Sequence, residues 1–148
     1  MKKLVLGAVL ALALTAAGCG GGGSTTLSKE EYGSQLNTIC ADYNAKVKEI
    51  GEPSSISELA DKGPTLLDEF DAAIAKAEKL KAPDELAATR DEFFSKSKDL
   101  RNTISDIVDA AKANDSAKIN ELGPKADELS SQTDALGKKL GAPACAEG

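Results

Sequence analysis

The chain has 148 residues, a formal net charge of −6, three cysteines, and neither histidine nor tryptophan. An acidic chain is repelled by the phosphates of nucleic acids, so this composition excludes nucleic-acid binding. Without histidine the chain lacks Ser–His and Cys–His nucleophile–base pairs, histidine-ligated haem and the Glu-x-x-His pairs of di-iron bundles. We therefore expect a protein that is not an enzyme and that holds no cofactor and no metal ion.

The first 18 residues have the pattern of a secretory signal peptide. Lys2 and Lys3 precede an apolar run over residues 4–14. This run is too short to cross a membrane, because a spanning helix needs about 20 apolar residues. Small residues at 16–18 then lead to Cys19. This ending resembles the lipobox of bacterial lipoproteins, although Ala16 stands where that family favours leucine.

The resemblance to bacterial lipoproteins implies a location as well as a modification. In that family the cysteine sulfur takes a diacylglycerol, the chain is cut just before this cysteine, and the new amino end is usually acylated. Cys19 would then hold the protein on the extracytoplasmic side of the cell membrane through covalent lipid, and two or more acyl chains make such an anchor stable. An ordinary signal peptide with a nearby Ala-x-Ala-like cleavage site is the alternative.

Residues 19–27 are expected to form the lipidated cysteine and a flexible tether. Seven Gly, Ser and Thr residues follow Cys19, and a random coil of this length reaches about 15 Å. The helical domain is predicted over residues 28–148.

The first helix is predicted over residues 29–50. Ser28 and Glu31 have the spacing of a capping box, with Leu27 and Tyr32 at the positions of a hydrophobic staple. One apolar stripe then recurs at steps of three and four residues, as on an amphipathic helix: Tyr32, Leu36, Ile39, Tyr43, Val47 and Ile50.

Three further helices are predicted over residues 56–81, 84–113 and 116–140. Ser55 and Glu58 suit the start of the second, and Pro83 forces the turn after it. In the third, Phe93 and Phe94 are adjacent, so at most one is expected to point fully into the core, while the other fills a neighbouring helix interface or lines a groove. The carboxylate clusters at 68–71 and 91–92 are interpreted as solvated faces, with weak cation binding as the alternative.

Four helical segments joined by short turns predict an all-α fold, an antiparallel four-helix bundle. Proline removes a backbone donor inside a helix, so a kink or a short break is expected at the Gly-Pro sites 63–64 and 123–124. These sites are 60 residues apart, and so are the Ala-Pro pairs at 82–83 and 142–143. The repeat suggests that the even-numbered helices bend at the same height, and it leaves a true duplication open.

The cysteine count favours one intrachain disulfide. If Cys19 carries lipid, Cys40 and Cys145 remain as a pair in an oxidising compartment. In an up-down-up-down bundle the end of the fourth helix returns to the side of the first, which brings the two within reach. Free thiols, or pairing between chains, are the alternatives.

The Leu-Ser-x-x-x-Tyr opening, the early Cys40, the Leu-x-Ala-Pro turn and the closing Leu-Gly-x-x-x-Cys resemble a class of small secreted or lipid-anchored actinobacterial proteins without an established activity. The resemblance supports the fold and the disulfide and implies no functional residue. From the tether and the polar helix faces we expect a non-enzymatic protein-binding or adaptor module of the cell envelope, whose partner the sequence does not name. The alternative is a carrier or sensor of a small apolar ligand or lipid held between the helices.

Overall fold

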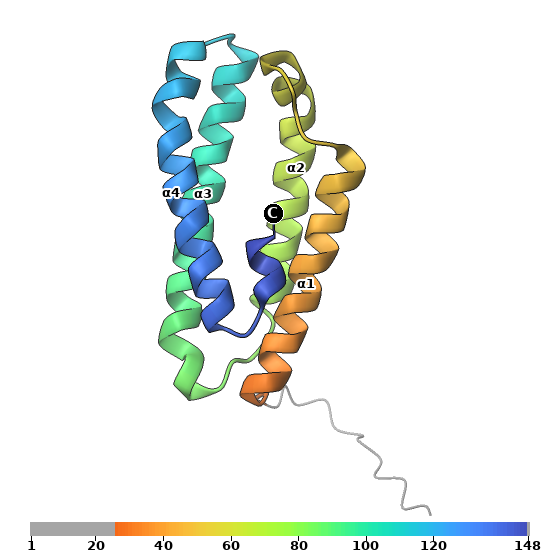
Figure 1. The fold of residues 1–148 in the computed structure, drawn as a ribbon, viewed down its shortest axis with the longest axis vertical. Coiled ribbons are helices and arrows are strands. Elements are labelled where there is room, and N and C mark those ends of the chain that lie inside the picture. The colour runs from red at the N-terminus through yellow and green to blue at the C-terminus, as the bar shows by residue number, and fades with distance from the viewer. Residues whose placement is uncertain (1–25, 148) are drawn as a thin grey trace, which may run out of the picture.

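The computed structural model describes residues 26–147 (Figure 1). Within this range the chain forms helices and turns and no strand: α1 (Lys29–Ile50), α2 (Ile56–Ala77), the 3-10 turn η1 (Asp84–Leu86), α3 (Ala87–Lys112), α4 (Ser116–Lys139) and the 3-10 turn η2 (Pro143–Ala146). The four long helices run alternately up and down, which confirms the all-α antiparallel four-helix bundle. The predicted signal peptide, Cys19 and most of the predicted tether lie outside the described residues.

Helix α1 begins and ends where the sequence predicts. The Glu31 amide donates to Ser28 Oγ at 3.2 Å, and the Ser28 amide donates to the Glu31 carboxylate at 2.9 Å, so both halves of the capping box form. These hydrogen bonds from Ser28 favour the ionised carboxylate and lower the pKa of Glu31. Gly51 ends the helix with a φ of 81°, a conformation that glycine adopts without a steric penalty.

Helix α2 ends earlier than predicted, at Ala77 instead of residue 81. The chain tightens there into turns whose hydrogen bonds span three residues. The carbonyl oxygen of Lys81 is then free to accept a hydrogen bond from the Leu27 amide at 3.0 Å. The residues before Pro83 therefore do not extend α2. Through the Lys81 carbonyl they bind Leu27, just before α1.

The predicted third helix is divided into η1 and α3. Helix α3 ends in a Schellman motif in which Asn114 takes a φ of 54° and the Asp115 amide donates to the Ala110 carbonyl at 2.8 Å. Helix α4 ends in the same way, with Gly141 at a φ of 82° and the Ala142 amide donating to Gly137. The second motif turns the chain back along the bundle toward η2.

The two Gly-Pro sites lie inside uninterrupted helices. Pro64 and Pro124 each stand eight residues after the first residue of their helix. The N-caps Ser55 and Asp115 are also 60 residues apart, and each accepts a hydrogen bond from the amide three residues on. The short break that the sequence allowed does not occur. The N-cap and the proline stand at equivalent positions of α2 and α4. A duplication stays a hypothesis.

The C-terminal segment, residues 140–147 with η2 at its centre, completes the bundle. After α4 it folds back and lies between α4 and α1, where η2 contacts both helices (Figure 1). A cluster of buried apolar residues lies at the end of the bundle where α1 begins and α4 ends: Tyr32, Leu36, Ala77, Leu86, Phe93, Phe94, Leu136, Leu140 and Ala142.

The prediction that at most one of Phe93 and Phe94 faces the core is wrong. Both are buried, at 5% and 8% exposed, and their rings meet edge to face with centroids 5.6 Å apart. Helix α3 has α2 on one side and α4 on the other, so two adjacent positions, about 100° apart around the helix, both face neighbouring helices.

Candidate functional site

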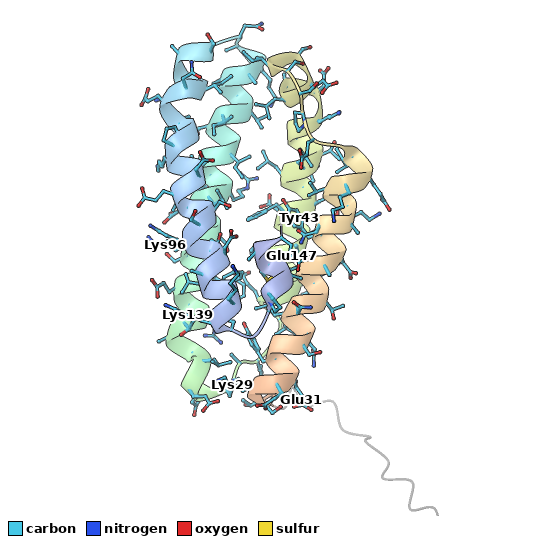
Figure 2. All side chains as sticks on the ribbon, viewed as in Figure 1. Lys29, Glu31, Tyr43, Lys96, Lys139 and Glu147 are labelled. Carbon is cyan, nitrogen blue, oxygen red and sulfur yellow. A yellow bond between two sulfur atoms is a disulfide. The ribbon has the colours of Figure 1, made fainter. Side chains whose placement is uncertain are left out.

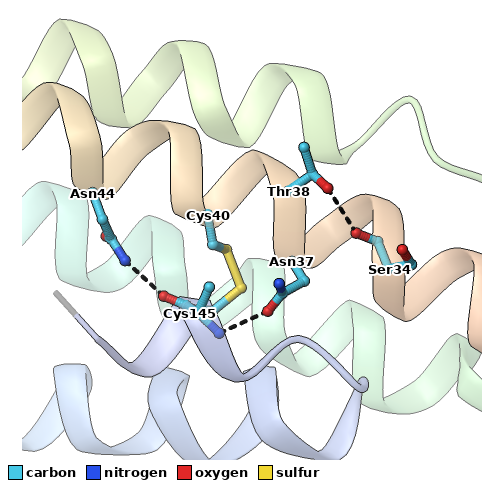
Figure 3. The surroundings of a disulfide bond; sticks show 7 residues. Ser34, Asn37, Thr38, Cys40, Asn44 and Cys145 are labelled. Atoms are coloured by element: carbon cyan, nitrogen blue, oxygen red, sulfur yellow. Dashed lines mark hydrogen bonds between the residues drawn. A yellow bond between two sulfur atoms is a disulfide. The ribbon is translucent and has the colours of Figure 1, made fainter.

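Polar groups of α1 hold the C-terminal segment in place (Figure 3). Asn37, Cys40 and Asn44 are spaced by three and four residues, so they share one face of the helix. Asn44 Nδ2 donates to the Ala144 carbonyl at 2.7 Å, and the Ala144 amide donates to Asn37 Oδ1 at 2.8 Å. Helix α1 thereby satisfies both backbone polar groups of one residue, which fixes the height of the segment against the helix.

The disulfide lies between these two hydrogen bonds. Cys40 and Cys145 are bonded, with their Cα atoms 4.9 Å apart, which confirms the predicted intrachain pair over free thiols or pairing between chains. The predicted lipid attachment at Cys19 lies outside the described residues.

Two glycines let the C-terminal segment approach the helices closely. A Cβ on Gly33 of α1 would lie 2.9 Å from the Leu140 carbonyl oxygen, and a Cβ on Gly137 of α4 would lie 2.8 Å from Cys145 Cβ. Real Cβ atoms essentially never lie within 3.0 Å of such atoms, so the segment fits only because both positions lack a side chain.

A cavity of about 330 Å³ lies beside the disulfide, between the four long helices. Cys40 and Cys145 form part of its wall. Its volume is at the lower end of the ~300–1,000 Å³ typical of small-molecule sites. Helix α2 contributes only apolar side chains to the lining: Phe70, Ala73, Ile74 and Ala77.

Tyr43 of α1 lines the cavity together with Phe70. Their rings meet edge to face, with centroids 5.6 Å apart and planes at 82°. Burial raises the pKa of the Tyr43 hydroxyl, so the side chain stays neutral at ordinary pH. In Figure 2 Tyr43 lies on the inner side of α1, whereas Lys139 of α4 points away from the bundle.

The α4 side of the cavity is more polar. Asp127, Ser130, Thr133 and Asp134 line it, and the Thr133 hydroxyl donates to the Ser130 carbonyl at 2.8 Å. Burial raises the pKa of Asp134, and the charge of Lys138 partly opposes this shift. Asp127 is exposed whereas the other lining residues are buried or half-buried, so we place the mouth of the cavity beside it.

One acid of each carboxylate cluster forms an ordinary surface ion pair. Both Asp71 oxygens accept from Arg101, at 2.7 and 2.9 Å for the shortest pairs, and Asp91 pairs with Arg90 at 2.6 Å. Exposed pairs of this kind contribute about 0–1 kcal/mol. Within residues 26–147 no group of three metal-ligating side chains could hold an ion, and none of the helices combines the length and hydropathy that a membrane crossing requires.

Sequence reasoning found the disulfide but missed the two asparagines beside it. Asn44 is 8% exposed, and a buried amide needs a hydrogen-bond partner. Its place next to Tyr43, inside the apolar stripe of α1, was the available signal. The partner could not be named because it is a backbone group 100 residues away.

Comparisons with models of known protein families, with curated proteins and with solved structures each found no match.

Proposed function

We propose that this chain is a membrane-anchored, extracytoplasmic lipoprotein whose helical domain binds a small apolar ligand between its helices. The cavity of about 330 Å³, with its apolar wall on α2, carries this proposal. Removing apolar surface from water gains about 25 cal/mol per Å², so a ligand that covers this wall is stabilised without further contacts. Binding of this kind needs no bond to be made or broken, in keeping with a non-enzymatic role.

Because of the cavity we rank ligand binding above protein binding, whereas the sequence alone favours a protein-binding module. A protein-binding or adaptor module needs an outer surface and a tether, but it does not need an internal apolar space beside a disulfide. An envelope protein partner stays a prediction and is placed second.

The anchor is tested by metabolic labelling with a palmitate analogue in the host. Wild-type protein is expected to carry the label, and Cys19→Ser protein is expected to lose it, because the proposed acceptor sulfur is gone. Label that survives the substitution would reject lipid attachment at Cys19. Cys40→Ser supplies the matched control, since Cys40 is bonded to Cys145 and should not affect labelling.

The cavity is tested by thermal unfolding of the full chain, followed by helical circular dichroism, with and without 1-octanol. A ligand that binds only the folded state raises the melting temperature. We expect this rise in wild type and in Ala135→Leu, whose position on α4 is exposed. Ala126→Leu places three carbons into the cavity and should abolish the rise.

If octanol raises the melting temperatures of Ala126→Leu and Ala135→Leu equally, it binds elsewhere. A wild type whose melting temperature does not rise with octanol would argue against the cavity as an apolar site.

A further inference from the structure

The wall of the cavity is divided between an apolar side and a polar side. Helices α2 and α4 lie diagonally across the bundle (Figure 1). The four α2 residues that line the cavity are all apolar, whereas four of the five from α4 are polar or charged. From α3, Ser97 adds a hydroxyl that is 2% exposed. A wholly apolar ligand would take the polar groups on this side out of contact with water and offer them no hydrogen bond, which costs free energy.

The charges on the polar side have one sign. Asp127 and Asp134 are the charged residues that line the cavity, and among residues 26–147 no lysine or arginine lines it. Lys138 lies outside the lining, and its charge acts on Asp134 from the next turn of α4. A carboxylate head would therefore meet two like charges, whereas an ammonium head would meet two opposite ones.

We propose, building on the proposed function, that the cavity takes a single-chain amphiphile with a positively charged head. The tail packs against Phe70, Ile74 and the other α2 residues, and the head lies at the mouth between Asp127 and Asp134. The volume of about 330 Å³ suits one chain and not two. Anionic chains of the same length, such as fatty acids, are disfavoured by the carboxylates.

The chain supplies its own reporter for this test. It contains no tryptophan and two tyrosines, of which Tyr43 lines the cavity and Tyr32 does not. The buried Tyr32 hydroxyl has no hydrogen-bond partner in the structure, so Tyr32→Phe is expected to fold. In that background Tyr43 is the single tyrosine, and its fluorescence reports on occupancy of the cavity.

The experiment titrates the lipidated Tyr32→Phe protein, anchored on phosphatidylcholine vesicles, with octylammonium, 1-octanol and octanoate. All three carry an eight-carbon tail. We expect octylammonium to bind at least about tenfold more tightly than octanoate, with octanol between them. Asp127→Asn combined with Asp134→Asn should bring the three affinities together. Asp106→Asn, an exposed position outside the cavity, is the matched control and should leave the order unchanged.

The outcomes separate the two proposals. Octanoate that binds as tightly as octylammonium, or an order that survives the double substitution, would overturn the cationic head while leaving an apolar site in place. Three titrations without saturation would overturn the apolar site itself. Partitioning into the vesicles is the same for every variant, so differences between variants report on the protein.

Discussion

Gly63 and Gly123 precede equivalent prolines in α2 and α4, yet they have different surroundings. A Cβ on Gly63 would overlap the side chain of Val108, which is 1% exposed on α3. A Cβ on Gly123 would meet nothing within 4 Å apart from its chain neighbours and the adjacent backbone of its own helix. The first glycine is needed for the packing of two helices, and the second is not.

The two glycines predict unequal effects of one substitution. Gly63→Ala should lower the free energy of unfolding by about 1–3 kcal/mol, because α2 and α3 must separate to fit the new methyl group. Gly123→Ala should change it by less than about 0.5 kcal/mol, because the helix preference of alanine is opposed by contact of its Cβ with the Pro124 ring. Urea unfolding followed by circular dichroism measures both, and equal losses of stability would contradict this account of the packing.

At the scale of residues, the sequence predicts which positions are special but not which residues contact them in space. The 60-residue spacing identifies both glycines as members of one pattern. It cannot separate them, because Val108 reaches Gly63 from another helix whose register no local pattern specifies. For the same reason the apolar stripe of α1 predicts Tyr43 on the inner face but not its contact with Phe70.

Among the elements, the C-terminal segment is joined to α1 by the disulfide between Cys40 and Cys145. The disulfide joins residues 105 positions apart, and in the chain-entropy model closing a loop of this length stabilises by about 4–5 kcal/mol. Reduction should therefore lower the urea midpoint substantially. The Cys40→Ala, Cys145→Ala chain should already unfold at the lower midpoint and should not respond to reductant. A wild-type midpoint that reductant leaves unchanged would count against the segment as a stabilising element.

Element boundaries were predictable where the signals are local. The capping box of α1 and the caps of α4 are sequence neighbours of the helices they bound, so the predicted bounds agree within one residue. The end of α2 was not predictable, because the Lys81 carbonyl is taken by Leu27, a residue from the other end of the domain's first hairpin.

For the whole molecule, the sequence predicts the bundle but not its cavity. Alternating apolar steps and short turns are enough to specify four antiparallel helices. The space between them depends on how η2 separates α1 from α4, and so on close approaches at Gly33 and Gly137 that involve residues far apart in the chain. The cavity is thus a property of the assembled bundle, and none of its helices contains it alone.

Native mass spectrometry of the protein taken from the membranes of its host tests the central claim most directly. The protein should be released with a polymer, since a detergent is itself an amphiphile that could occupy the cavity. We predict that wild-type and Ala135→Leu protein carry the added mass of one small molecule, and that Ala126→Leu protein carries none. Wild-type protein that arrives empty, or the same added mass in Ala126→Leu, would contradict a ligand held between the helices.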